Sequence, residues 1–434
     1  MSKKPQIKSV KGMNDILPTQ SPLWLTVESV CRTVFDNHSY RQIRTPIVES
    51  TQLFYRSIGA ETDIVSKEMY TFDDRNGDSL TLRPEGTASC VRAGIQNGLF
   101  YNQQQRLWYT GPMFRHERPQ KGRYRQFFQM GAEVYGWSTP DIEAEVLSMI
   151  QQIFQRLGLQ KTHLEINSLG DSDARNAYRQ ALVDYLTDFK DELDEDSQRR
   201  LTTNPLRILD SKNEGVQAIL KGAPSILDYL SPESDEKFSQ LKAHLEDLGI
   251  DYTINPNLVR GLDYYNDTVF EWINADFGAQ STVCGGGRYD GMVEQLGGQP
   301  TPGFGFGMGL ERLIQILQEQ EAAITQDDMA PDVFLVSVGE QARRQSILLQ
   351  QKLTSSDVKV MCHCGSGSMK NQFKKADKSG AAIALVIGED ESQVEQVSVK
   401  LLRRRDVDGG VEQNQQTIAQ NDALSAVTDL LKSL

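Results

Sequence analysis

Residues 303–312 read GFGFGMGLER, and this stretch decides how the rest of the chain is interpreted. Glycine alternates with a bulky apolar residue, which predicts a β-strand with two unlike faces. The apolar face, which begins with Phe304, is expected to pack into a core, while the glycine face leaves bare backbone against which a flat ring fits. A helix is expected from Leu310, and Arg312 in its first turn offers a planar guanidinium suited to phosphate. Tight packing of a glycine-rich strand against a neighbouring helix is the alternative interpretation.

A second segment, FRHERPQKGRYRQF at residues 114–127, places cations around a Pro/Gly turn. Its cationic residues are Arg115, Arg118, Lys121, Arg123 and Arg125. On a chain with a net charge of −13, this local positive charge indicates an anionic partner, although a solvated hairpin tip would look similar. Phe127 could stack on a base, so the two segments together predict a nucleotide site. The glycine spacing fits neither a dinucleotide fingerprint nor a P-loop.

Length and composition narrow the class of protein. A chain of 434 residues is too long for one ordinary core, so two or three domains are expected. No apolar run approaches the ~20 residues of a membrane span, and the N-terminus lacks the apolar stretch of a secretory signal. Five scattered cysteines, an odd number, fit free thiols in a reducing cytoplasm. The CHC sequence at 362–364 supplies too few ligands for a tetrahedral site, so no tightly bound, protein-ligated metal is expected.

Periodicity indicates how the elements are ordered. Helices are expected at 22–38 and 141–157, extended segments at 40–49, 80–82, 106–110 and 126–135, and strand-like sequence again from Asn257. The stretch at about 170–250 is charged and helical, which is typical of a module inserted into a domain. A polar linker at 319–331 precedes alternating strands and helices, which predict a small α/β domain with a largely parallel sheet. We therefore expect one domain at 1–325, interrupted by the insertion, and another at 331–434.

With YRQIRTPIVE at 40–49, the two opening segments resemble the three ordered motifs of class II aminoacyl-tRNA synthetases. Three more segments narrow the resemblance to the histidyl-tRNA synthetases: TLRPEGT (81–87), LVRGLDYYNDTVFEW (258–272) and GGGRYDG (285–291). The likeness runs from about Val10 into the C-terminal domain. It implies an α+β fold, in which an antiparallel-sheet catalytic domain carries a helical insertion and an α/β anticodon-binding domain follows. It also implies a homodimer formed through the first motif.

The resemblance further implies a two-step reaction. ATP, with Mg²⁺ held mainly through phosphate oxygens, would activate L-histidine to histidyl-adenylate. Histidine would then move to the 3′ end of tRNA(His). No side-chain base is needed, because the attacking carboxylate is already ionised at neutral pH. The implied catalytic residues at the α-phosphate are Arg115 and Arg260, with Arg260 standing where other members of the class use a metal.

The residues implied to bind each substrate follow from matching motifs. Those for histidine are Glu85, Gly86, Thr87, Arg115, Gln129, Glu133, Arg260, Tyr264 and Tyr265. Those for ATP are Arg115, Glu117, Arg123, Phe127 and Arg312. Those for tRNA are Gln120, Lys121, Arg123, Arg125, Lys370 and Lys374. Within these sets, Glu85 would accept from the α-ammonium group, and Glu133 and Tyr265 would bind the imidazole nitrogens, which are one donor and one acceptor. Without the resemblance, Glu133 would be interpreted as a partly buried structural carboxylate, and Tyr264 and Tyr265 as aromatic residues of the core and its rim.

Two other functions and one uncertainty of register remain open from the sequence. A regulatory, histidine-sensing relative would lack the anticodon module and have eroded ATP motifs, whereas this chain keeps Arg115, Arg312 and a C-terminal domain. A synthetase for another amino acid, such as proline or threonine, is disfavoured by LVRGLDYY. Phe127 is followed by Phe128, so a shift of one residue would exchange the two aromatic side chains and displace Gln129.

Overall fold

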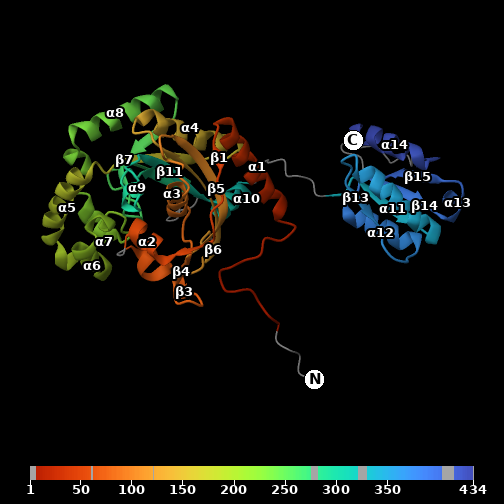
Figure 1. Ribbon diagram of the computed structural model, residues 1–434, viewed down its shortest axis with the longest axis horizontal. Coiled ribbons are helices and arrows are strands. Elements are labelled where there is room, and N and C mark those ends of the chain that lie inside the picture. The colour runs from red at the N-terminus through yellow and green to blue at the C-terminus, as the bar shows by residue number, and fades with distance from the viewer. Residues whose placement is uncertain are drawn as a thin grey trace, which may run out of the picture. The chain divides into compact units, whose positions relative to one another are not determined.

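The structure is a computed structural model, and it describes residues 6–59, 62–120, 122–274, 282–320, 330–402 and 415–433. The chain divides into two compact units, Met1–Asp327 and Asp328–Leu434, each of which is described by itself (Figure 1). Most of the polar linker predicted at 319–331 lies outside the described residues. Among the helices that are described, none is both long enough and apolar enough to cross a bilayer.

An eight-stranded sheet forms the centre of the first unit. Its spatial order is β1 (Arg41–Gln42), β5 (Gln105–Phe114), β6 (Gln126–Tyr135), β11 (Gly303–Gly309), β10 (Thr282–Arg288), β9 (Asn266–Asn274), β7 (Thr162–Ser168) and β8 (Tyr252–Ile254). The six central strands pair antiparallel, and only the outermost pairs, β1 with β5 and β7 with β8, are parallel. The predicted α+β class is confirmed.

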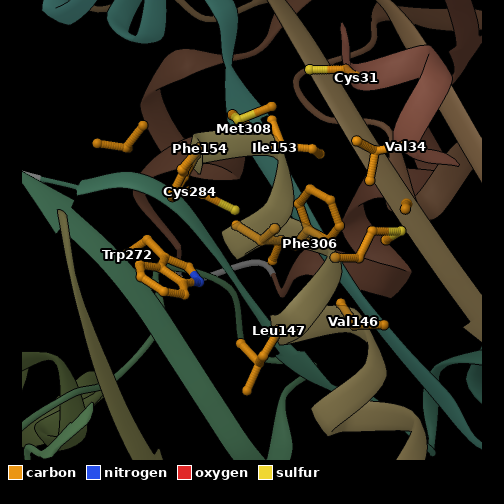
Figure 2. Packing of buried hydrophobic residues seen from close by; sticks show 14 of the residues in the cluster. Cys31, Val34, Val146, Leu147, Ile153, Phe154, Trp272, Cys284, Phe306 and Met308 are labelled. Carbon is orange, nitrogen blue, oxygen red and sulfur yellow. The ribbon is translucent and has the colours of Figure 1, made fainter. Parts of the chain in front are cut away.

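Helices cover the sheet and enclose the main core. The helices outside the inserted stretch are α1 (Ser21–Asn37), α2 (Thr51–Ile58), α3 (Thr87–Gln96), α4 (Pro140–Arg156), α9 (Met292–Gln295) and α10 (Leu310–Glu319). Figure 2 shows side chains of α1, α4, β9, β10 and β11 meeting in one cluster, among them Val34, Phe154, Trp272 and Phe306. The apolar face of the alternating strand therefore packs into the core, as its sequence predicts.

A smaller sheet and a π-helix complete the body of the first unit. The sheet has the order β2 (Val48–Ser50), β4 (Ser79–Leu82) and β3 (Tyr70–Asp73), and both of its pairings are antiparallel. The π-helix η1 (Ile64–Glu68) lies between α2 and β3 in the chain. The extended segment at 40–49 is divided, because its first part pairs with β5 in the large sheet and its end begins the small one.

The helical stretch between β7 and β8 divides its packing between two cores. Its elements are α5 (Ser172–Thr187), η2 (Lys190–Glu192), α6 (Glu195–Thr203), η3 (Pro205–Ile208), α7 (Glu214–Leu220), η4 (Ile226–Tyr229) and α8 (Pro232–Asp247). Apolar residues of α8, such as Leu241, join the main core with α4. Those of α5 to η4, such as Leu182, join a second cluster that contains Tyr264 and Tyr265. Helices α5, α6 and α7 lie together at one edge of this unit (Figure 1).

The strand expected from Asn257 begins only at Asn266. The eight residues before it, 258–265, form a loop that we call the tyrosine loop, because it ends in Tyr264 and Tyr265. These residues do not form a strand, because their apolar side chains pack into the second buried cluster. Its first carbonyl, of Leu258, accepts a 3.0 Å bond from the Asn167 side chain.

The second unit is an α/β domain around a five-stranded sheet. The strand order is β13 (Val360–Cys362), β12 (Val333–Ser337), β14 (Ile383–Ile387), β15 (Gln396–Leu401) and β16 (Gln415–Ala419). Its helices are α11 (Glu340–Thr354), α12 (Met369–Ser379), α13 (Glu389–Gln393), η6 (Gln420–Asp422) and α14 (Ala423–Lys432). The prediction of a largely parallel sheet is confirmed only in part, because β12 pairs parallel with β13 and β14, whereas β14 with β15 and β15 with β16 pair antiparallel. Between β14 and β15 lies α13, whose five residues are too short for the crossover that a parallel pair requires.

Candidate functional site

A cavity of about 940 Å³ opens on the glycine strand of the first unit. Sequence-predicted residues that line it are Arg115, Glu117, Arg123, Phe127, Gln129, Arg260 and Arg312. They come from the ends of β5, β6 and α10 and from the tyrosine loop, which are far apart in the chain. Folding thus brings the guanidinium groups of 115, 260 and 312 around one hollow. A cavity with several cations is suited to an anion that carries more than one charge.

Arg115 is held by a backbone carbonyl, and the two aromatic residues after the turn have different surroundings. The Nε of Arg115 donates to the Pro84 carbonyl at 2.9 Å, and its guanidinium lies 5.3 Å from the centre of the Phe127 ring. Phe127 lines the cavity, whereas Phe128 packs edge-on against Trp24 with ring centres 5.4 Å apart. The structure therefore settles the register, and Phe127 is the aromatic that faces the hollow.

Glu311 lines the cavity beside Arg312 and also has a structural contact. Both of its carboxylate oxygens accept from the Phe128 backbone N–H at 2.9 Å, which ties the start of α10 to β6. Burial raises the pKa of Glu311 to about 7. Arg312 donates to the backbone carbonyl of Thr282, and burial lowers its pKa.

The basic loop after β5 is a tight turn with its own ion pair. Gln120 and Arg123 exchange backbone hydrogen bonds, and Arg123 reaches Glu117 at 3.2 Å. The Nε of Arg125 donates to the Glu117 carbonyl at 3.2 Å. Lys121 lies outside the described residues. Glu117 thus holds Arg123 through its carboxylate and Arg125 through its backbone carbonyl.

Two residues that the sequence analysis did not single out link the arginines at 260 and 312. Glu271 pairs with Arg260 through one oxygen and accepts from the Thr282 hydroxyl at 2.7 Å through the other. The Thr282 carbonyl accepts from Arg312. Thr282 therefore connects Arg312 to Glu271 and, through Glu271, to Arg260. A register shift between Thr282 and Cys284 allows this placement, as β-bulges near active sites do. Arg260 also has a buried Nε without a hydrogen-bond partner among the described residues.

A second group of predicted residues forms a hydrogen-bonded chain beside the cavity. Glu85 accepts from the backbone N–H groups of Thr87 and Ala88 at 2.7 and 2.8 Å, so it caps helix α3. The Thr87 hydroxyl donates to Glu133 at 2.7 Å. Burial raises the pKa values of both carboxyl groups, that of Glu133 to about 8. A pair of buried acids held this way suits a ligand that carries cationic or N–H groups.

Tyrosines surround Glu133, including two that the sequence analysis missed. Tyr109 donates to one oxygen of Glu133 at 3.1 Å, and Tyr289 donates to the other. Tyr264 and Tyr265 have ring centres 4.5 Å apart, and Tyr289 lies edge-on to both. Tyr289 belongs to the glycine-rich segment 285–291, so its motif was visible although its role was not. Tyr109 sits inside β5 without a motif of its own.

The glycine face of β11 is mostly occupied by the protein itself. A Cβ atom at Gly305 would lie 1.8 Å from the Glu133 carboxylate, and one at Gly307 would lie 2.3 Å from the Gln129 amide. Only at Gly309 would a Cβ meet nothing within 4 Å. Within this strand, the open backbone against which a flat ring could lie is therefore at Gly309. The missing side chains at Gly305 and Gly307 make room for Glu133 and Gln129. The buried Oε1 of Gln129 has no hydrogen-bond partner among the described residues.

The remaining predicted residues have simpler surroundings. At Gly86, before α3, a Cβ would lie 2.2 Å from the Tyr109 ring, so only glycine fits. Lys370 and Lys374 are exposed on α12 of the second unit. Among the residues that the structure describes, no cluster of three or more His, Cys, Asp or Glu side chains has the arrangement of a metal site.

Comparisons with known proteins show which family the chain resembles over most of its length. A family model described as histidyl-tRNA synthetase matches residues 12–313, and an anticodon binding domain model matches residues 332–430. A histidine–tRNA ligase of Hydrogenovibrio crunogenus (strain DSM 25203 / XCL-2) is 56% identical over 400 residues, which cover 92% of this chain and 93% of that protein.

Solved structures show the same architecture. The apo histidyl-tRNA synthetase of S. aureus gives a TM-score of 0.81 at 38% identity, over 97% of this chain and 100% of that one. An ATP phosphoribosyltransferase regulatory subunit/histidyl-tRNA synthetase of Bacillus halodurans gives 0.64 at 20% identity, over 89% and 99%. At 20% identity the second likeness shows the fold alone.

Proposed function

The chain belongs to the histidyl-tRNA synthetase family and acts as a histidine–tRNA ligase, and we propose that the cavity on the glycine strand holds ATP beside histidine. The first unit is the class II catalytic domain and the second is an anticodon-binding domain. One observation carries the proposal about the site. Three guanidinium groups, of Arg115, Arg260 and Arg312, line a single cavity next to the buried Glu85–Thr87–Glu133 chain.

Catalysis in the first step rests on positioning and on charge. The histidine carboxylate attacks the α-phosphorus of ATP, and pyrophosphate leaves. The negative charge that develops on the α-phosphate would be stabilised by Arg115 and Arg260, whose positions are fixed before the substrate arrives. Because Arg260 already carries the needed positive charge, no protein-bound metal is required at the α-phosphate.

The rest of the ATP molecule would occupy the outer part of the cavity. Arg123 and Arg312 would hold the outer phosphates, and Mg²⁺ would enter as part of the MgATP substrate, bound mainly through phosphate oxygens. Phe127 would stack on adenine, with Glu117 at the edge of the adenine pocket. The open backbone at Gly309 offers the adenine ring a flat surface.

The histidine side chain would reach the tyrosine-lined pocket. Glu133 and Tyr265 would pair with the two imidazole nitrogens, and Tyr264 would line the same pocket. Glu85 and Thr87 would accept from the α-ammonium group, together with the Gln129 oxygen, which has no partner among the described residues. An amino acid without two ring nitrogens would leave these buried groups unpaired, which gives strong discrimination.

The partners beyond the small substrates follow from surface chemistry. The loop residues Gln120, Lys121, Arg123 and Arg125 would meet the acceptor end of tRNA(His), while Lys370 and Lys374 would lie near the anticodon.

A homodimer through the first motif is supported by exposed apolar side chains at Leu25, Ile47 and Val48. A cytoplasmic location is supported by five cysteines that are all free thiols.

Amino-acid-dependent exchange of pyrophosphate into ATP tests the activity. We expect exchange with histidine and none above background with the other amino acids, proline and threonine included. Absence of histidine-dependent exchange would defeat the proposal and would favour a regulatory, histidine-sensing role.

Replacing Gly305 by alanine is expected to lower kcat/KM for histidine about 100-fold. The new methyl group would collide with the Glu133 carboxylate, at 1.8 Å, and with the Ala132 carbonyl, at 2.7 Å. The measurement is histidine-dependent exchange as a function of histidine concentration. Gly291→Ala is the matched control, since a Cβ there meets nothing within 4 Å. Equal losses in both variants would contradict the role given to the glycine face.

Replacing Thr282 by valine is expected to slow adenylate formation about tenfold. The change removes the hydroxyl that holds the second oxygen of Glu271, and Glu271 in turn holds Arg260. Thr282→Ser keeps the hydroxyl and is expected to retain most of the rate. If the serine and valine variants are equally slow, the hydroxyl does not position the arginine.

A further inference from the structure

The helical elements α5 to η4, residues 172–229, pack into the same buried cluster as the tyrosine loop, and this cluster also holds Leu107, Tyr135 and Val269 of the large sheet. Leu182, Leu201 and Val216 of these elements belong to the same buried cluster as Tyr264 and Tyr265. The main core holds none of these five residues. The two groups of residues are separated in the chain by α8 and β8, so their contact is made only by folding.

Two polar contacts fasten the same helices to the end of the loop. A guanidinium N–H of Arg175, in the first turn of α5, donates to the backbone carbonyl of Tyr265. The Asn204 amide, just after α6, donates to the Asp263 carboxylate at 3.0 Å. A hydrogen bond from a charged donor to a partly buried carbonyl is among the stronger contacts available to a loop.

The body of the catalytic domain holds the loop at its start, Leu258, and at the backbone of Asp263. Asn167 of β7 holds the Leu258 carbonyl, and the Asp263 N–H donates to the Ile58 carbonyl at 3.2 Å. Among the residues that the structure describes, the side-chain donor to the Tyr265 carbonyl is Arg175 and not a residue of the body. The loop also carries Arg260, whose guanidinium lies 5.8 Å from the centre of the Tyr265 ring. A displacement of the loop end would therefore move a tyrosine and an arginine of the site together.

We propose that the helices at 172–229 form part of the histidine-binding apparatus, in which Arg175 and Asn204 are positioning residues. They touch neither substrate. They hold the tyrosine loop in the conformation that places Tyr265 and Tyr264 around the imidazole ring. The inserted helices thereby set the affinity for histidine from outside the cavity. This inference rests on the proposed histidine site.

The test compares the effects of Arg175→Met on the two small substrates in pyrophosphate exchange. Methionine keeps an unbranched side chain but cannot donate to the Tyr265 carbonyl. We expect the KM for histidine to rise about tenfold, the scale of one lost hydrogen bond from a charged group, with the KM for ATP unchanged. Arg175→Lys, which can still donate, should recover much of the loss.

Arg179→Met is the matched control, because Arg179 lies one turn further along α5 and is exposed. It should leave both KM values unchanged. A KM for histidine in Arg175→Met equal to that of the unmodified enzyme would overturn the inference, as would an equal rise in both KM values. If Arg175→Met fails to fold, Asn204→Ala must show the same selective rise or the inference fails. Absence of histidine-dependent exchange in the unmodified chain would instead defeat the proposed function.

Discussion

Arg260→Ala is expected to slow histidyl-adenylate formation about 1,000-fold, the scale of losing one preorganised donor at a developing oxyanion. The same change should alter the dissociation constant of ATP by less than about threefold. Arg260 is held by Glu271 and lies close against Gly285, where a Cβ would approach its guanidinium within 2.8 Å. Its interaction with the α-phosphate should strengthen as charge develops, so the loss should fall on the rate.

Single-turnover rates and equilibrium ATP binding separate the two effects of Arg260→Ala. The substitution leaves Glu271 without its cationic partner, so a second variant, Arg260→Ala with Glu271→Gln, removes that unpaired charge. Both variants should be similarly slow, because Glu271 acts through the arginine. Arg156→Ala, at the exposed end of α4, is the control. Comparable losses of ATP binding and of rate would refute the catalytic assignment.

Glu133→Gln is expected to lower histidine activation about 1,000-fold, because the amide alters the buried pattern of donors and acceptors that would read the imidazole. It should also change how stability depends on pH. Burial raises the pKa of Glu133 from 4.5 to about 8, although Tyr289, Thr87 and Tyr109 donate to it. The folded protein therefore binds this proton more tightly than the unfolded chain does.

The sign of the stability effect follows from this linkage. The contribution of a group with a raised pKa is fully present below its unfolded pKa and is lost as pH rises through its folded pKa. Between pH 5 and pH 8, the melting temperature of the unmodified protein should therefore fall relative to that of Glu133→Gln. Thermal unfolding across that range measures the difference. Glu236→Gln, on the exposed face of α8, should follow the unmodified protein. A constant difference between the proteins at all pH values would show that Glu133 does not titrate there.

Local patterns in the sequence predicted the elements that depend on local physics. The strand at 126–135 has the predicted bounds, and β11 and α10 begin where glycine alternation and the helix start indicate. Each of these follows from side-chain periodicity, which a single segment contains. The resemblance to the synthetase family also anticipated that Arg115, Arg260 and Arg312 share the cavity.

Contacts between strands that are far apart in the chain could not be predicted from the sequence. Glu133 occupies the space over Gly305 because β6 and β11 pair in a register that aligns these two residues. That register joins segments about 170 residues apart, and neither segment specifies it alone. The bridging roles of Glu271 and Thr282 depend likewise on a bulge between β9 and β10. Residues 258–265 do not form the predicted strand, because their apolar side chains pack into the second buried cluster.

A crystal structure with histidine and a non-hydrolysable ATP analogue tests the central claim most directly. We expect an α-phosphate oxygen within about 3 Å of the guanidinium groups of Arg115 and Arg260. The imidazole ring should lie against the Glu133 carboxyl group, inside the ring of tyrosines. Phosphates bound away from both arginines, or an imidazole outside that pocket, would contradict the account.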